Sequence, residues 1–391
     1  MKKICIVTST RAEYGLLRNL IERVSRDPNL ELCLIVTGMH LSPEFGMTVN
    51  EIETDGYPIT EKVDILMSSD NVAAVSKTMG IAAISFADVF ERQRPDMLVV
   101  LGDRYELLPI CSCAMNAHVP IAHISGGETT EGAVDESIRH CITKMSYLHF
   151  PACEAYRKRI IQLGESPNRV FNFGDVGVEL IRTIDLLEKS QLEKLIGFSL
   201  GGSYACVTFH PTTLEVGTAE KQIEEVLKAI SSFPEMKFIF TKANSDADGR
   251  IINKKIDKYV PKNENCIAFI SMGFQRYLSC LKYAAVVIGN SSSGIVEAPS
   301  FGIPTINIGD RQKGRLQADS VINCKPIKEE VEKAIKLALS DKFKNKAKHT
   351  INPYGNGNTS EKIVDVIKDV LLNEKISLKK KFNDLDFEVI E

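Results

Sequence analysis

Short apolar segments alternate with longer stretches of helical periodicity along almost the whole chain. Buried parallel strands read as short apolar runs, whereas a helix places apolar residues three or four positions apart. Alternation of the two predicts right-handed β-α-β crossovers and parallel sheets that are covered on both faces. In the first half we expect strands at residues 3–8, 32–37, 97–101, 120–124 and 148–150, and helices at 14–26, 72–92, 105–116, 134–145 and 154–163.

The pattern pauses over residues 185–202, which end in two glycines, and then resumes. We therefore expect a boundary near residues 175–200, with a first domain at 1–180, a second at 181–358, and a C-terminal helix and tail at 359–391. The polar tail is expected to be frayed. In the second half we expect strands at residues 205–209, 238–240, 267–269, 285–288 and 304–308, and helices at 220–230, 329–339 and 360–372.

Two doubly wound Rossmann-like α/β domains in one chain predict a cleft between them, because the carboxyl ends of both sheets face a shared crevice. A chain of 391 residues is also too long for a single core. The formal net charge of −3 gives no general attraction to nucleic acid, so an anionic substrate must be held by local cations. We expect a small-molecule partner, with no nucleic acid and no membrane.

The first apolar stretch ends at Val7, and Arg11 and Glu13 follow, so it is too short for a signal peptide. There is no run of 18 apolar residues, so we expect no transmembrane helix. The ten cysteines are irregularly spaced without a zinc-binding pattern, which is typical of reduced thiols in a cytoplasmic protein. Residues 72–90 are apolar on more than one side, which favours a homo-oligomer or burial inside the monomer.

Polar clusters follow the predicted strands of the first domain. Ser9 and Arg11 open the first helix, where free N–H groups favour anions, although an N-cap with a surface arginine fits the same residues. Asp103 follows strand 97–101 and is either a catalytic group or an N-cap. Glu128 follows two glycines that allow a ligand to approach the backbone. Asp135 is four residues before Arg139 and could form an ion pair with it. Three acids at neighbouring strand ends would have divergent pKa values, which suits acid and base roles.

The second domain offers a different set of groups. His210 ends strand 205–209 and could contact a phosphate or sugar, or it could be a packed structural residue. Residues 288–297 lead from a strand into a helix through small residues, which predicts a phosphate cradle with Glu297 beside it for ribose hydroxyls. Residues 309–315 then supply three cations to the same cleft. Neither segment is a Walker A loop or a dinucleotide-binding glycine motif.

Seven of these segments, in this order, resemble the hydrolysing UDP-N-acetylglucosamine 2-epimerases of sialic-acid biosynthesis, and the resemblance spans about residues 3–360. It implies a GT-B-like fold, no metal, no cofactor, and UDP and N-acetylmannosamine as products. The resembling segments are TRAEYG at 10–15, TGMHLS at 37–42, GDR at 102–104, GGE at 126–128, DESIRH at 135–140, GNSSSG at 289–294 and GDRQKGR at 309–315.

The resemblance also implies roles for individual residues. Its catalytic carboxylates correspond to Asp103, Glu128 and Asp135, and its cleft histidine to His210. Its nucleotide contacts correspond to Arg11, Ser291, Ser292 and Glu297. We add to the predicted substrate-binding set Ser9, His40, Arg104, Arg139, Asn290, Gly294, Arg311 and Arg315.

The implied reaction removes the C2 proton as UDP leaves C1, which gives a glycal that water then rehydrates with inversion at C2. Glu128 and Asp103 are the candidate base and acid, in either order, with Asp135 assisting. The asparagine and serines at 290–293 favour the hydrolysing branch. That branch also acts on 2,4-diacetamido-trideoxy sugars of legionaminic-acid pathways, and these motifs do not define the groups at C4 and C6. The competing hypotheses are a GT-B glycosyltransferase and a non-catalytic nucleotide-sugar sensor. We expect a dimer or tetramer.

Overall fold

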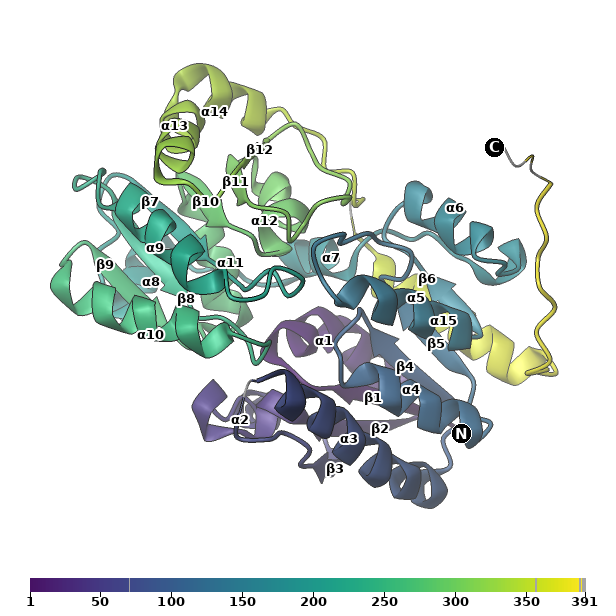
Figure 1. Cartoon of the computed structure of the whole chain (residues 1–391). Helices are drawn as coiled ribbons and strands as arrows, with labels where there is room; N and C mark the ends of the chain where they lie inside the picture. The colour runs from purple at the N-terminus through teal and green to yellow at the C-terminus, as the bar shows by residue number, and fades with distance from the viewer. Residues whose placement is uncertain (70, 356, 387, 389–391) are drawn as a thin grey trace.

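The computed structural model describes residues 1–69, 71–355, 357–386 and 388, and it contains two six-stranded sheets (Figure 1). The first sheet has the parallel order β3-β2-β1-β4-β5-β6. Alternate residues of β1 enter opposite cores, with Ile4 and Ile6 on one face and Cys5 and Val7 on the other. Its elements are β1 (Lys2–Thr8), α1 (Arg11–Arg26), β2 (Leu30–Thr37), α2 (Val49–Thr54), β3 (Ile59–Val63), α3 (Val72–Gln93), β4 (Met97–Leu101), α4 (Leu107–Asn116), β5 (Ile121–Ile124), α5 (Asp135–Met145), β6 (Leu148–Phe150) and α6 (Glu154–Gln162).

The second sheet has the parallel order β12-β11-β10-β7-β8-β9, which repeats the arrangement of the first. In both sheets the strand order reverses between the first and fourth strands, and ligands of such sheets bind at the carboxyl ends there. Its elements are α8 (Lys189–Ile196), β7 (Tyr204–Thr208), α9 (Ala219–Ile230), β8 (Lys237–Thr241), α10 (Gly249–Tyr259), β9 (Cys266–Phe269), α11 (Gly273–Tyr283), β10 (Val286–Gly289), α12 (Ser293–Val296), β11 (Thr305–Ile308), β12 (Val321–Cys324), α13 (Lys328–Leu339) and α14 (Asp341–Lys348).

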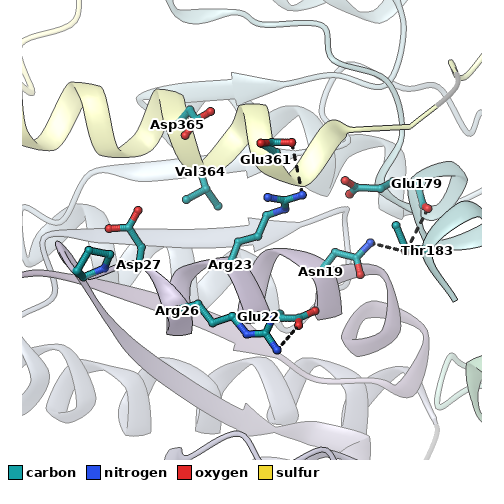
Figure 2. Close-up of a pocket in the computed structure, with 11 residues that line it drawn as sticks. Asn19, Glu22, Arg23, Arg26, Asp27, Glu179, Thr183, Glu361, Val364 and Asp365 are labelled. Atoms are coloured by element: carbon teal, nitrogen blue, oxygen red, sulfur yellow. Dashed lines mark hydrogen bonds and ion pairs between the residues drawn. The ribbon is translucent and has the colours of Figure 1, made fainter.

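Two further helices, one between the two sheets in the sequence and one near the C-terminus, pack on the first domain. Both α7 (Val176–Thr183) and α15 (Thr359–Asn373) pack against α1, and α15 places Ile363 and Ile367 in the same core as β1. Figure 2 shows charged side chains of α1, α7 and α15 around a groove of about 510 Å³. Arg23 faces Glu361 across it at 3.5 Å. The last helix therefore returns to the first sheet instead of forming a separate unit.

The prediction of a frayed tail is wrong for the segment around Lys380, which lies along the first domain (Figure 1). The Lys380 ammonium donates to the backbone carbonyls of Lys144 and Ser146 at 2.8 and 2.7 Å, and it pairs with Glu165 at 2.7 Å. These acceptors explain why the tail is held at Lys380. The last carbonyls of α5 lack helical partners, and the buried Glu165 carboxylate needs a countercharge.

Helix α3 is long and apolar enough to cross a membrane, by length and composition only. In the structure it covers the first sheet, and Phe86 and Phe90 lie in the core. Its outer side carries Val72 and Ile84, which are 69% and 74% exposed. The helix thus has a buried apolar face and exposed apolar residues on the other side.

The edge strands β3 and β12 are absent from the elements that the sequence pattern predicts. Strand β3 alternates partly covered and exposed positions before the buried Val63, and β12 has three partly covered positions and one exposed position, so neither forms a continuous buried apolar run. Helix α4 begins at Leu107, later than predicted, because residues 102–106 form the loop that carries Asp103. All ten cysteines are free thiols.

Candidate active site

Two adjoining pockets lie at the carboxyl ends of the strands where the order of each sheet reverses. The acidic pocket, about 160 Å³, is lined by Asp103, Glu128 and Asp135. The serine pocket, about 170 Å³, is lined by Arg11, His210 and residues 291–293. Residues of both domains line each pocket, and several of them, including Ser292, Glu297 and Arg311, line both pockets. The two pockets therefore form one cleft between the domains.

The three predicted carboxylates meet in the acidic pocket, and their surroundings shift their pKa values in different directions. Burial opposes the charge of Asp103, yet Arg139 and Arg315 outweigh it and hold the pKa of Asp103 below its ordinary value. Burial raises the pKa of Glu128, although Arg315 works against the rise. Burial and the neighbouring Asp103 raise the pKa of Asp135 to about 6. Near neutral pH the pocket can therefore both accept and donate protons.

Arg139 forms the frame of the acidic pocket. Its fully buried guanidinium donates to Asp103, to Thr130 Oγ1 at 2.9 Å and to the backbone carbonyl of Glu128 at 3.0 Å. It also pairs with Glu136 at 3.0 Å. The sequence suggested a pair between Asp135 and Arg139, and that partner assignment is wrong. Asp135 is the first residue of α5, and Arg139 turns toward the strand-end loops instead.

Glu128 is joined to the second domain. Its Oε2 lies 2.5 Å from Arg315 Nη2, and both side chains are nearly excluded from solvent. Arg104 makes a second link, with Nη1 2.5 Å from Asp246 Oδ1 and Nη2 3.2 Å from Ser245 Oγ. Arg315 and Arg104 thus both connect the two domains at the acidic pocket.

The serine pocket has an anion-binding character. Arg11 begins α1, donates to the carbonyl of Lys242 at 3.2 Å and lines the pocket. Ser291 and Ser292 follow β10, and Tyr277 donates to Ser293 Oγ at 2.7 Å. Backbone N–H groups, hydroxyls and guanidinium groups of this kind bind phosphate oxygens.

Two buried polar atoms of the serine pocket have no partner within the described chain, namely His210 Nδ1 and Glu297 Oε2. Burial, with Arg311 next, lowers the pKa of His210 to about 3, so its imidazole is neutral at physiological pH. Burial raises the pKa of Glu297. A buried polar atom without a partner is costly, so these two atoms mark positions where a ligand would contribute hydrogen bonds.

Four residues of the predicted substrate-binding set do not line the pockets, and they make contacts within the protein instead. Asn290 clamps the backbone of His210, accepting from its N–H at 2.7 Å and donating to its carbonyl at 2.8 Å. Gly294 packs against Thr305, whose Cγ2 would lie 2.7 Å from an added Cβ. Ser9 Oγ donates to Glu13 at 2.6 Å, and His40 is buried between two threonine hydroxyls. None of these four lines either pocket.

Of the three cations predicted at 309–315, the structure brings only two into the described cleft. Arg311 and Arg315 line the acidic pocket. Lys313 points outward, with its side chain 59% exposed and its ammonium 3.2 Å from Glu131. The prediction of three cleft cations is wrong for Lys313, because this residue lies at the end of a turn closed by its N–H and the Asp310 carbonyl, and its ammonium pairs with the exposed Glu131.

Two acids that the sequence did not single out also line the acidic pocket. Burial raises the pKa of Glu13 to about 7, and the pKa of Asp175 also to about 7. Glu13 forms a capping box with Thr10, and Asp175 caps α7. The Thr10-x-x-Glu13 spacing would have identified the cap but not its place in the pocket. Among the described residues, no group of three or more His, Cys, Asp or Glu is arranged to hold a metal ion.

Two Rossmann-like domains of matching strand order, with a shared cleft at the switch points, define a GT-B-like protein with a small-molecule site between its domains. Solved structures agree on the fold. The Staphylococcus aureus MnaA–UDP complex matches with a TM-score of 0.80 at 19% identity, covering 96% of this chain and 99% of its own. The Neisseria meningitidis UDP-GlcNAc 2-epimerase bound to UDP-GlcNAc matches with a TM-score of 0.78 at 18% identity, covering 94% and 100%.

Sequence comparison identifies the family. A family model described as UDP-N-acetylglucosamine 2-epimerase matches residues 22–368, and the chain belongs to this family. A Campylobacter jejuni GDP/UDP-N,N'-diacetylbacillosamine 2-epimerase (hydrolyzing) is 47% identical over 323 residues, covering 82% of this chain and 84% of the relative. The Escherichia coli polysialic acid biosynthesis protein P7 is 41% identical, covering 97% of each chain. The protein is thus similar to hydrolysing UDP-sugar 2-epimerases.

Proposed function

We propose that this protein is a hydrolysing 2-epimerase that converts a UDP-linked 2-acetamido sugar and water into UDP and the free 2-epimeric sugar. The observation that carries the proposal is the cleft itself. Three carboxylates of unequal pKa face one end, while Arg11, the serines and two unpartnered polar atoms face the other. This pairing of proton-transfer groups with an anion site suits elimination of a diphosphate from a sugar.

In the proposed first half, a carboxylate takes the C2 proton while the bond between C1 and the diphosphate oxygen breaks. The products are UDP and a glycal with a C1–C2 double bond. In the second half, the hydroxyl of water adds to C1 and a proton reaches C2 from the opposite face, so the net change is hydrolysis with inversion at C2. Glu128 and Asp103 are the candidates for base and acid, in either order, and Asp135 assists them.

The serine pocket would hold the nucleotide. Arg11 and Arg311 would neutralise the diphosphate, and the neutral His210 imidazole would donate a hydrogen bond to the leaving oxygen or to the sugar. The unpartnered Glu297 Oε2 would accept from a ribose hydroxyl. Because negative charge grows on UDP as it leaves, fixed cations stabilise the transition state more than the ground state.

The relatives favour a particular sugar. Two of them, from C. jejuni and from Legionella pneumophila at 33% identity, are diacetylbacillosamine 2-epimerases. We therefore propose UDP-N,N'-diacetylbacillosamine, a 2,4-diacetamido-trideoxy sugar nucleotide, as the preferred substrate. UDP-N-acetylglucosamine is the second candidate, because a Neisseria meningitidis UDP-N-acetylglucosamine 2-epimerase is 31% identical over 99% of this chain.

Parallel assays of UDP release with each sugar nucleotide distinguish the two candidate substrates, and chromatography identifies the free sugar that is formed. A higher kcat/KM for the diacetamido donor supports the proposal, whereas a higher value for UDP-N-acetylglucosamine reverses the substrate assignment. UDP release that requires an added acceptor sugar would instead indicate the competing glycosyltransferase. Tight UDP-sugar binding without turnover of either donor would indicate a nucleotide-sugar sensor.

The free cysteines fit our expectation of a cytoplasmic enzyme.

A further inference from the structure

The inference concerns what holds Arg315 against Glu128, and it rests on the proposed function. Arg315 belongs to the second domain, and it reaches Glu128 of the first across the cleft at 2.5 Å. The arginine lies in a loop without regular structure, where Arg315 N donates to the carbonyl of Gln312 at 3.2 Å. A loop arginine keeps one orientation only if the adjacent backbone is fixed. The contacts of Leu316, the next residue, therefore determine how firmly Arg315 is held.

Two buried tyrosines fix the backbone of Leu316. Its N–H donates to Tyr156 Oη at 2.9 Å, and its carbonyl accepts from Tyr354 Oη at 2.8 Å. The two hydroxyl oxygens lie 3.0 Å apart. Because Tyr354 gives its proton to the carbonyl, Tyr156 must be the donor between the hydroxyls. The result is a closed ring of hydrogen bonds that starts and ends on Leu316.

Tyr156 also contacts the loop that carries Glu128, the acidic partner of Arg315. Tyr156 lies on α6, and its backbone carbonyl would be 2.6 Å from a Cβ added to Gly127, the residue before Glu128. The Gly127 carbonyl accepts from Arg159 of the same helix at 2.5 Å. Both tyrosines are at most 1% exposed. Helix α6 therefore contacts the Glu128 loop with its backbone and the Arg315 loop with a hydroxyl.

We propose that Tyr156 and Tyr354 are positioning residues of the reaction, which hold Arg315 against Glu128 and so fix the orientation and charge of that carboxylate. Neither hydroxyl lines a pocket of the cleft, so neither is a catalytic residue. Tyr354 lies outside both sheets, between α14 and α15, and this position gives the segment a role in the site.

The test compares Tyr156→Phe and Tyr354→Phe with Tyr204→Phe. Tyr204 is a matched control, because it is also fully buried and its hydroxyl donates to a backbone carbonyl, that of Cys280, at 2.6 Å within the second domain. Tyr204→Phe loses one buried hydrogen bond, whereas Tyr156→Phe and Tyr354→Phe each lose two, including the one between the two hydroxyls. Each variant is therefore expected to melt at a lower temperature, the two site variants by more.

Only the two site variants are expected to change the chemistry. A loosened Arg315 should lower kcat by about 10- to 100-fold with KM changed less than about threefold, because misplacement acts on the proton transfer and not on the nucleotide grip. Arg315 lowers the pKa of Glu128, so the pH limb of kcat that belongs to Glu128 should move to higher pH by about 0.5 to 1, whether this residue acts as base or acid.

A readout without turnover separates this inference from the proposed function. The carboxyl carbon of Glu128, identified by its loss in Glu128→Gln, can be titrated by carbon-13 NMR in wild type and variants. A higher pKa of Glu128 in Tyr156→Phe and Tyr354→Phe, but not in Tyr204→Phe, supports positioning even if no epimerase activity is found. An unchanged titration, with kcat within about twofold of the control, would overturn the inference.

Discussion

Replacement of Glu128 by Gln tests the assignment of proton transfer to the acidic pocket. Gln keeps the size of the side chain and can still accept a hydrogen bond from Arg315, but it cannot take or release the C2 proton. The wild-type carboxylate is 3% exposed, so water has little access to replace it. Loss of a positioned acid or base costs about 10²- to 10⁴-fold in rate. That is about 3 to 5 kcal/mol in the barrier.

The same substitution removes the countercharge of a buried arginine. Breaking a buried pair destabilises a protein by about 3–5 kcal/mol. Asp103 remains close enough to affect the same arginine, so the cost here is expected at or below the lower end. Thermal melting must therefore accompany the kinetics, at a temperature where the variant is folded.

Glu131→Gln is the matched control for Glu128→Gln. Glu131 lies three residues further along the same loop, with its side chain 52% exposed and paired with Lys313. We expect Glu128→Gln to lower kcat about 10²- to 10⁴-fold, with the affinity for UDP by calorimetry nearly unchanged, and Glu131→Gln to change neither. A Glu128→Gln enzyme with near-native kcat and weakened UDP binding would show that Glu128 binds substrate and does not transfer the proton.

Three further predictions concern the nucleotide, pH and assembly. Arg11→Ala and Ser292→Ala should both raise KM. A charged hydrogen bond contributes about 1.5–3 kcal/mol, so the rise for Arg11→Ala should be about 10- to 100-fold. An unchanged KM and an unchanged Kd for UDP would contradict this. The pKa of Asp175, about 7 when folded and 3.8 as its ordinary value, means that its contribution to stability is complete below pH 3.8 and is lost as the pH rises through 7. Urea unfolding at pH 5 and 8 should therefore show a larger loss of unfolding free energy for wild type than for Asp175→Asn, and equal losses would refute the assignment. Sedimentation at micromolar concentration should show a dimer that Ile84→Lys converts to the 43.4 kDa monomer, and a monomeric wild type would contradict the expected oligomer.

The sequence predicts the parts of the site that depend on local order. Asp103 and His210 follow apolar strands, and the doubly wound topology brings the ends of those strands to one cleft. The capping box at Thr10 and Glu13 is visible from spacing alone. These features could be predicted because each depends on a few neighbouring residues and on the handedness of the crossover.

The partners of the charged groups could not be predicted in this way. Arg139 pairs with Asp103, 36 positions away, in place of its helical neighbour Asp135, and Arg315 pairs with Glu128 of the other domain. His40 lies in a conspicuous motif but is buried between Thr8 and Thr48. Each outcome depends on side-chain directions after the two domains pack, and apolar periodicity carries no information on those directions.

In the proposed reaction, the enzyme removes and replaces the proton at C2 while UDP leaves C1. Proton NMR in D₂O measures this directly, with UDP-N,N'-diacetylbacillosamine as substrate and UDP-N-acetylglucosamine in parallel. We expect release of UDP together with a free sugar of inverted C2 configuration that carries deuterium at C2, so that its C2 proton signal is absent. A free sugar that keeps both its C2 proton and its original configuration would refute C2 proton transfer, because UDP would then have left by simple hydrolysis.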